Sequence, residues 1–168
     1  MELKDYFLMQ LEQETTLTRK AIERVPEGHN DWKPHPKSMA LGYLAALVAS
    51  MPGWIASMIE RDELNFGDPS SAEFRQGALE SRAELLQLLE TSAAKSKRAL
   101  EGTDEKHLHD RWRMISGNRV LYEGARYVMI SDGVFSHLAH HRGQLTVYLR
   151  LNEAAVPALY GPSADEAQ

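Results

Sequence analysis

The run His137-Leu-Ala-His-His-Arg-Gly-Gln-Leu-Thr-Val-Tyr-Leu-Arg150 is the stretch of this sequence that says most about its fold. Two of its histidines and several apolar residues recur at three- and four-residue steps, which is the spacing of one face of an α-helix. The same face continues toward the N-terminus, and its members are Tyr127, Ile130, Val134, His137, His141, Leu145 and Tyr148. The spacing therefore predicts a helix over 124–152 that buries this face.

Three further helices are predicted upstream of this one. Apolar residues at helical spacing among charged residues place them at 3–24, 39–60 and 71–100. For the second we expect Ser38 as the N-cap and a kink where Pro52 removes a backbone donor. Gly102 is expected to end the third helix, and 61–70 is expected to be a loop.

A short irregular or hairpin arm is predicted between the third and fourth helices. Over 103–124 the helical spacing stops, and Ser116-Gly117-Asn118 separates two short apolar stretches. Four helices and this arm predict an all-α fold, a four-helix bundle. The length of 168 residues suits a single domain over 1–168. Its C-terminal tail, 156–168, is expected to fray at the end.

Composition limits the kinds of partner and of metal ligand. The sequence contains no cysteine, so any metal must be bound by histidine or carboxylate. A net charge of −5 without a basic cluster argues against nucleic acid as a partner. The first residues, Met-Glu-Leu-Lys-Asp-Tyr, carry charges where a secretory signal has an apolar run, so we expect a cytoplasmic protein.

The stretch 39–59 contains no charged residue and is long enough to cross a bilayer. However, it includes Tyr43, Ser50, Pro52 and Ser57, which make it less apolar than a typical membrane-spanning helix. We therefore expect the buried central helix of a protein that does not enter membranes.

His137 and His141 are the candidate metal ligands. At a spacing of i and i+4 on the apolar face, their rings lie one above the other and can share one ion. The alternative is that both are core histidines whose nitrogens are hydrogen-bonded within the protein. Spacing alone favours this alternative, because HxxxH without the glutamate of HExxH is a weak pattern. His140 lies on another face and is expected to be exposed.

The same residues resemble those of a known family. The run from His137 to Arg150, followed by Val156-Pro157, Tyr160-Gly-Pro-Ser163 and Ala164-Asp-Glu166, looks like the last helix and tail of the DinB/YfiT-like superfamily. Leu41-Gly-Tyr-Leu-Ala45 through Pro52-Gly-Trp54 resembles its second helix. The resemblance implies an up-down-down-up bundle of bacterial type, frequent homodimers, and a divalent metal, zinc or nickel. One histidine of the second helix and the HxxxH pair of the fourth hold that metal.

In the related proteins with known activity, the metal serves thiol chemistry. They include thiol-dependent S-transferases and a mycothiol-dependent maleylpyruvate isomerase, in which the metal activates a low-molecular-weight thiol. This sequence departs from the pattern at position 47, where Leu47 replaces the histidine of the second helix. His107 or His109 in the arm could supply the missing ligand. With two histidines alone, we expect low metal occupancy.

Three functional hypotheses remain open. The leading one is a DinB-like protein with an incomplete metal site, related to metal- and thiol-dependent S-transferases and able to bind a small ligand in the bundle pocket. The alternative is a non-catalytic dimeric bundle that acts as a binding or interaction protein. A metal-dependent hydrolase needs a general base that the sequence does not identify, and the catalytic residues are unknown.

Trp54 and Tyr148 are expected in the core rather than in a pocket. Gly143 is expected to permit close helix packing, and Arg142 and Gln144 are expected to pair across helices or the dimer.

Overall fold

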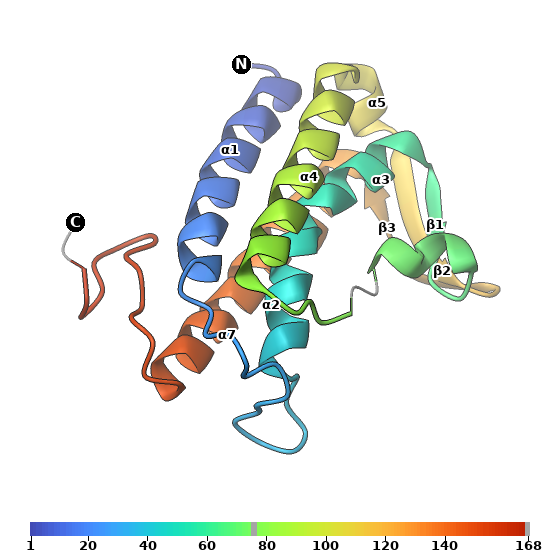
Figure 1. The fold of residues 1–168 in the computed structure, drawn as a ribbon. Coiled ribbons are helices and arrows are strands. Elements are labelled where there is room, and N and C mark those ends of the chain that lie inside the picture. The colour runs from blue at the N-terminus through green and yellow to red at the C-terminus, as the bar shows by residue number, and fades with distance from the viewer. Residues whose placement is uncertain (75–76, 167–168) are drawn as a thin grey trace.

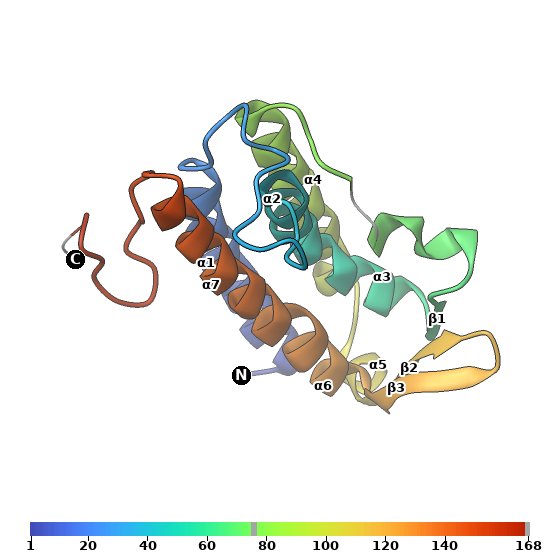
Figure 2. The same cartoon turned by 90° about the horizontal axis from the view of Figure 1, so that it is seen from below.

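The computed structural model describes residues 1–74 and 77–166, which form a helical body with a small sheet at one side (Figure 1). The helical elements are α1 (Leu3–Ile22), α2 (Leu41–Ser50), η1 (Met51–Gly53), α3 (Trp54–Glu60), η2 (Pro69–Phe74), α4 (Arg82–Glu101), α5 (Glu105–His109), α6 (Arg126–Ile130), η3 (Ser131–Ser136) and α7 (His137–Leu151). The strands are β1 (Glu63–Asn65), β2 (Arg111–Ser116) and β3 (Arg119–Ala125). Helix α1 packs on α4, and α2 packs on both α4 and α7 (Figures 1 and 2).

The prediction of an all-α four-helix bundle is wrong, because a three-stranded mixed sheet stands beside the helices (Figure 2). The hairpin in the arm is present: β2 pairs antiparallel with β3 around Gly117, whose φ of +57° suits glycine. Strand β1 then adds to β2 in parallel, with Glu63 opposite Arg113. The sequence predicts a loop at 61–70 because three residues cannot show an alternating pattern. The strand exists through its pairing with a segment 50 residues away.

The predicted second helix is present as three consecutive elements, α2, η1 and α3. Pro52 lies in η1, and the hydroxyl of Ser96 on α4 enters the backbone ladder at that point. Ser96 Oγ donates to Pro52 O at 2.6 Å and accepts from Ala56 N at 3.0 Å, in place of the direct helical bond. The N-cap is Ala40 and not Ser38 as predicted, since Ser38 N instead donates to His35 O.

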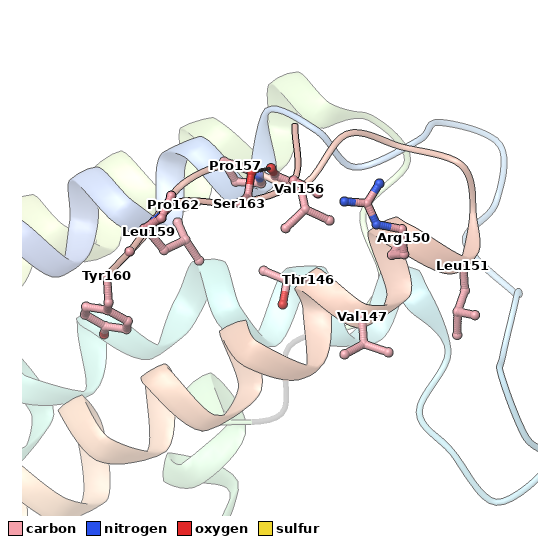
Figure 3. A pocket seen from close by; sticks show the side chains of 12 residues that line it. Thr146, Val147, Arg150, Leu151, Val156, Pro157, Leu159, Tyr160, Pro162 and Ser163 are labelled. Atoms are coloured by element: carbon pink, nitrogen blue, oxygen red, sulfur yellow. Dashed lines mark hydrogen bonds between the residues drawn. The ribbon is translucent and has the colours of Figure 1, made fainter. Parts of the chain in front are cut away.

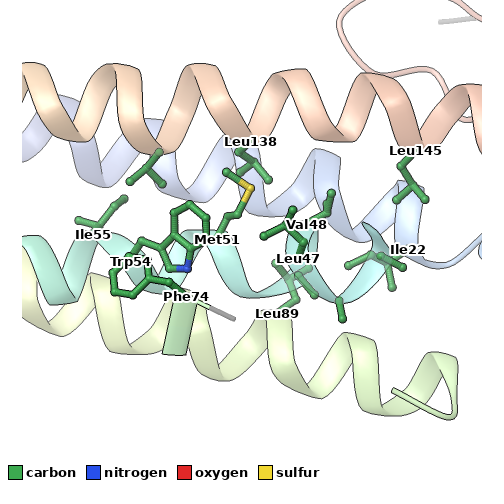
Figure 4. Close-up of a cluster of buried hydrophobic side chains, with 14 of the residues drawn as sticks. Ile22, Leu47, Val48, Met51, Trp54, Ile55, Phe74, Leu89, Leu138 and Leu145 are labelled. Carbon is green, nitrogen blue, oxygen red and sulfur yellow. The ribbon is translucent and has the colours of Figure 1, made fainter. Parts of the chain in front are cut away.

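Among the described residues, one helical stretch is long and apolar enough to span a membrane. It is Leu41–Glu60, which covers α2, η1 and α3, with a mean hydropathy of 1.4. It is 83% buried within the protein, as expected of the core helix of a soluble fold. Leu47, Met51, Trp54 and Ile55 pack there against Leu89 of α4 and against Leu138 and Leu145 of α7 (Figure 4).

Helix α4 starts later than the predicted 71, at Arg82. Ser81 caps it: its side chain accepts from Glu84 N, and the Glu84 carboxylate accepts from Ser81 N, which is a complete capping box. Near the predicted start, Pro69–Phe74 form the 3-10 turn η2. The predicted end is confirmed, because Gly102 is the C-cap. The apolar positions near the predicted start therefore belong to η2 and its connection to α4.

The predicted last helix runs from Arg126 to Leu151 but changes geometry midway. Between α6 and α7, η3 is π-helical, so this segment contains more residues per turn than the helices on either side. Gly133 in η3 lies close to α3, and a Cβ at this position would lie 3.4 Å from Met58 Cε. Helical spacing alone does not reveal such a turn, because it only displaces the apolar stripe slightly.

The C-terminal tail folds back along α7 and leaves a groove of about 500 Å³ (Figure 3). Arg150 and Asp165 form an ion pair at 2.5 Å, and Arg24 and Glu166 form another at 2.5 Å. The tail is therefore anchored as far as Glu166. The prediction of fraying after Asp165 is wrong for Glu166, and the rest of the predicted frayed end, 167–168, lies outside the described part of the chain.

Candidate functional site

His137 and His141 lie side by side at the start of α7. Their Nε2 atoms are 2.9 Å apart and their ring centroids 4.6 Å apart, and both side chains are half-buried. His140 is exposed as predicted, yet its ring still lies edge-on to that of His141, with 5.0 Å between centroids. The i, i+4 spacing thus brings the two ring edges together without any loop.

Gln144 bonds within the chain to His141 of its own helix, so its predicted pairing across helices is wrong, and this bond orients the His141 ring. The amide oxygen of Gln144 is 2.8 Å from His141 Nδ1, and because this oxygen only accepts, Nδ1 carries the proton. The lone pair of His141 Nε2 then faces His137 Nε2. A hydrogen bond between the two neutral rings needs the His137 proton on Nε2, whereas a bond from His137 to the Gly133 carbonyl uses that one proton on the other side of the ring. The contact of His141 with Gln144 would equally orient a metal ligand.

Burial lowers the pKa of both histidines. For His137 it outweighs the opposing effect of the Gly133 carbonyl, and for His141 that of the bond to Gln144. Repulsion between positive charges has the same effect: a protonated His140 lowers the pKa of both rings, and a protonated His137 lowers that of His141. Both rings are therefore held in the neutral form that metals bind and that a shared hydrogen bond requires.

The described residues offer no third ligand beside this pair. Leu47 is 7% exposed and belongs to the apolar core. His107 Nε2 bonds to Ile59 O at 2.9 Å, and His109 Nδ1 bonds to Glu105 O at 2.8 Å, so neither reaches the pair and both predicted substitutes are wrong. Across residues 1–74 and 77–166, no group of three or more His, Cys, Asp or Glu side chains could hold an ion. The residues present do not fit a three-ligand catalytic metal site.

A cavity of about 710 Å³ opens next to His137, between the helices and the sheet. Its walls come from α3, from β2 and β3, from η3 and from the segment between β1 and α4. The described lining residues are Trp54, Met58, Phe66, Phe74, Trp112, Met114, Tyr122, Met129, Asp132, Gly133, Ser136 and His137. The ring centroid of Trp54 lies 5.0 Å from that of Phe74 and 5.8 Å from that of His137. Trp54 thus joins the histidine pair to the cavity.

The sequence-based predictions assign none of these residues to a cavity lining. Trp54 is 8% exposed, so it is a core residue as predicted, but one side of its ring faces the cavity. Trp112 and Met114 share one face of β2, and Tyr122 lies opposite Met114 on β3. Alternation within the hairpin could have identified these three. Tyr148 is buried as predicted, and its hydroxyl donates to Met39 O at 3.1 Å.

Arg142 and Gly143 have different surroundings from those of their histidine neighbours. Arg142 is fully buried and pairs across helices as predicted, through a 2.5 Å ion pair with Glu14 of α1 and a 2.9 Å bond to Thr18 Oγ1. The Tyr160 hydroxyl joins them, donating to Glu14 Oε2 at 2.8 Å. Burial and this bond raise the pKa of Tyr160. Gly143 is exposed, and a Cβ there would meet nothing within 4 Å, so its predicted role in helix packing within the chain is wrong.

The helical body, the hairpin arm and the paired histidines on the last helix define a known class of protein, the DinB-like proteins. The model of the DinB family matches residues 1–168, and the chain belongs to this family. A DinB-like protein from Bacillus cereus ATCC 10987 has a similar structure, with a TM-score of 0.72 and 19% identity over 92% of this chain and 95% of that one. A DinB-like protein from Bacillus subtilis is also similar in structure, with a TM-score of 0.66 and 19% sequence identity. The match covers 89% of this chain and 94% of that one. No curated protein matches the sequence. The predicted resemblance is confirmed.

Proposed function

We propose that this protein is a DinB-family protein that binds a small, largely apolar molecule in the cavity beside His137, and that its histidine pair is an incomplete metal site. The observation that carries the proposal is the aromatic cavity itself. Its volume of about 710 Å³ lies within the range of small-molecule sites, and apolar side chains dominate its lining. His137 and Asp132 supply polar groups at the rim.

Thiol transfer and metal-dependent hydrolysis receive less support from the residues present. Both reactions would need an ion firmly held beside the nucleophile, and the pair His137 and His141 supplies two ligands where a catalytic site uses three. With Leu47 in the place of the third, zinc or nickel would bind at low occupancy. The relation to S-transferases then lies in ancestry, and binding is the activity we propose.

Elemental analysis tests the metal part of this proposal. The protein should be purified without a histidine tag and without added metal. We expect far less than one equivalent of zinc or nickel per chain. One equivalent, lost in a His141→Ala variant and kept in a His140→Ala variant, would show a working metal site and contradict the proposal.

The binding part is tested with N-phenyl-1-naphthylamine, a neutral fluorescent probe that brightens in apolar sites. It should be excited above the tryptophan absorption, and we expect saturable binding. Met114→Trp, which fills the cavity, should abolish binding, whereas Ile115→Trp, at a neighbouring half-buried position of β2 outside the cavity, should leave it unchanged. Absence of saturable binding, or equal effects of the two variants, would rule out the cavity as the site.

An interaction role as a homodimer is the second candidate, and the exposed face of α7 favours it. Val147 is 56% and Leu151 53% exposed, and Gly143 presents open backbone on the same side of the helix. Figure 3 shows Val147 and Leu151 pointing away from the C-terminal tail. A dimeric mass in light scattering that becomes monomeric in Val147→Glu, but not in Val128→Glu on α6, would support this interface. A monomeric wild-type protein would exclude it.

The proposed setting is the cytoplasm. The buried apolar stretch Leu41–Glu60 is the core helix of a soluble fold, and the net charge of −5 does not suit nucleic-acid binding. A fractionation experiment with an antibody against the untagged protein would test this location.

A further inference from the structure

We propose that the cavity selects an organic cation, an ammonium group carried on an apolar body; this rests on the proposed function, because it names the ligand class of the same cavity. Five aromatic side chains and one carboxylate carry the inference. They are Trp54, Phe66, Phe74, Trp112, Tyr122 and Asp132.

The aromatic rings come from separate segments and converge on one space. Trp54 stands on α3, Phe74 ends η2, Trp112 is on β2 and Tyr122 on β3. The Nε1 atoms of Trp54 and Trp112 have practically no exposed surface. The two indoles therefore present ring carbons, and not their N–H groups, to a bound molecule. Aromatic faces carry negative potential and attract cations, and tryptophan does so most strongly.

Thioether sulfurs complete the lining. Met58, Met114 and Met129 contribute from α3, β2 and α6. Sulfur is soft and polarisable, and methionine side chains adapt to irregular shapes. Methyl groups on an ammonium nitrogen spread its charge over a surface of carbon and hydrogen. Such a surface loses little hydration on entering a lining of rings and thioethers.

The charges around the cavity favour a cation over an anion. Asp132 is the one carboxylate among the described residues that line it, and none of these residues is Lys or Arg. The neighbouring arginines of the sheet bind carboxylates: Arg113 pairs with Glu63, and Arg111 with Glu123. Arg126 is buried and pairs with Asp62 at 2.5 Å. Among the described residues that line the cavity, an anion would thus meet aromatic rings and a carboxylate, and no Lys or Arg.

The size of the cavity sets a second condition on the ligand. About 710 Å³ is more than an ammonium head group fills, so the head group must carry an apolar body. An aryl or alkyl chain on the nitrogen meets this condition. The ligand class is therefore an amphiphilic amine or quaternary ammonium compound.

A pair of isosteres tests the inference. Phenyltrimethylammonium and tert-butylbenzene have nearly the same shape and differ in one positive charge. Each is titrated against the protein saturated with N-phenyl-1-naphthylamine, and the concentration that displaces half of the probe is measured. We expect the ammonium compound to act at a concentration at least about tenfold lower, although water solvates it far better. Benzoate, as the matched anion, should not displace the probe.

Two variants locate the source of the preference. Asp132→Asn should remove most of the difference between the isosteres while leaving displacement by tert-butylbenzene unchanged; Asp132 is exposed, so the variant should fold. Asp110→Asn, an exposed carboxylate outside the cavity, is the control. Trp112→Leu should weaken the ammonium compound alone, and Trp112→Phe should recover part of the loss. Melting curves confirm that each variant is folded.

The outcomes separate this inference from the proposed function. If the probe binds and both isosteres displace it equally, or benzoate displaces it best, the cation preference is wrong and the cavity remains a binding site. If the probe does not bind at all, the proposed function fails and the inference falls with it. If Asp132→Asn and Asp110→Asn behave alike, the carboxylate has no part in selection.

Discussion

Two adjacent residues of α7, His141 and Arg142, point to different sides of the helix, about 100° apart, and have unlike surroundings. Toward α1, Arg142 is fully buried, and both its terminal nitrogens have oxygen partners on Glu14, Thr18 or Tyr160. Toward the cavity, His137 and His141 are half-buried and bond to each other and to Gln144. One side of α7 is a structural junction between distant segments. The other side carries the His137/His141 pair, a contact between residues close in sequence, and His137 lines the cavity.

The difference shows that one side of α7 stabilises the fold while another side borders the candidate binding site. A buried guanidinium must be paired, since an isolated charge in the core is very costly. Its partners come from the first helix and from the C-terminal tail, so the junction depends on the whole fold. The histidines are neutral, and their polar partners are each other, Gln144 and the Gly133 carbonyl, all close by in η3 and α7. The binding side can thus change in sequence without loss of the fold.

Breaking the Arg142 junction should have the largest effect. Arg142→Met leaves the Glu14 carboxylate buried without its partner, and we expect a loss of about 3–5 kcal/mol in the free energy of unfolding. Urea denaturation followed by circular dichroism measures it. Arg150→Met, on the exposed side of the same helix, should cause no loss of this kind.

A double variant sharpens this prediction. Glu14→Leu combined with Arg142→Met removes both charges and should recover most of the stability lost by Arg142→Met alone. If the double variant is as unstable as the single one, packing and not the unpaired charge explains the loss.

Completing the histidine side should have an intermediate effect. Leu47→His replaces a buried apolar side chain, so the metal-free variant should lose about 1–3 kcal/mol of stability. Because α2 and α7 run in opposite directions (Figure 4), Leu47, which precedes Trp54, lies on the His141 side of the Trp54–His137 contact. We therefore expect the new imidazole to raise zinc affinity, measured by competition with a chelator, and zinc to restore the melting temperature. No gain in affinity over the wild type would mean that position 47 does not face the pair.

The smallest effect should be a dependence of stability on pH that only the histidine side shows. Burial holds the pKa of His137 and His141 below the ordinary histidine value of about 6.5. The unfolded chain then takes up protons at a higher pH than the folded chain. Their contribution to stability is fully present above about pH 6.5 and is lost as the pH falls below it.

Denaturation midpoints between about pH 7.5 and about pH 5 measure this slope. His141→Leu should flatten it, and His140→Ala should leave it unchanged, because His140 is exposed. A slope that both variants alter equally would show that the histidine cluster titrates as a whole. Arg142 should contribute nothing to it, since arginine stays charged across this range.

Helical spacing predicted the long elements and the paired histidines, because both depend on neighbours within a few turns. The start of α4 could have been corrected from the sequence, since Ser81-Arg-Ala-Glu84 spells a capping box. The predicted start at 71 ignored that signal in favour of the apolar residues before it.

Other features depend on contacts that sequence spacing does not encode. Strand β1 has three residues and is a strand only through its parallel partner β2. The Glu14 partner of Arg142 is 128 residues away in the chain. The cavity needs α3, η3 and the hairpin at once, so no single segment predicts it. Within the hairpin, alternation places Trp112 and Met114 on one face of β2, but the register shift between Met114 and Ile115 means that the pairing with β3 cannot be read from spacing.

The one additional residue in the π-helical turn η3 sets the rotation of α6 and the hairpin relative to α7. Each residue of an α-helix turns the chain by about 100°, and a π turn absorbs an additional residue within a continuous helix. Deleting one residue from Ser131–Ser136 would restore regular α geometry and rotate α6 and the attached hairpin by roughly that angle about the axis of α7. The aromatic wall from the hairpin would then swing out of line with His137. In this segment the number of residues therefore matters more for the shape of the cavity than the chemistry of their side chains.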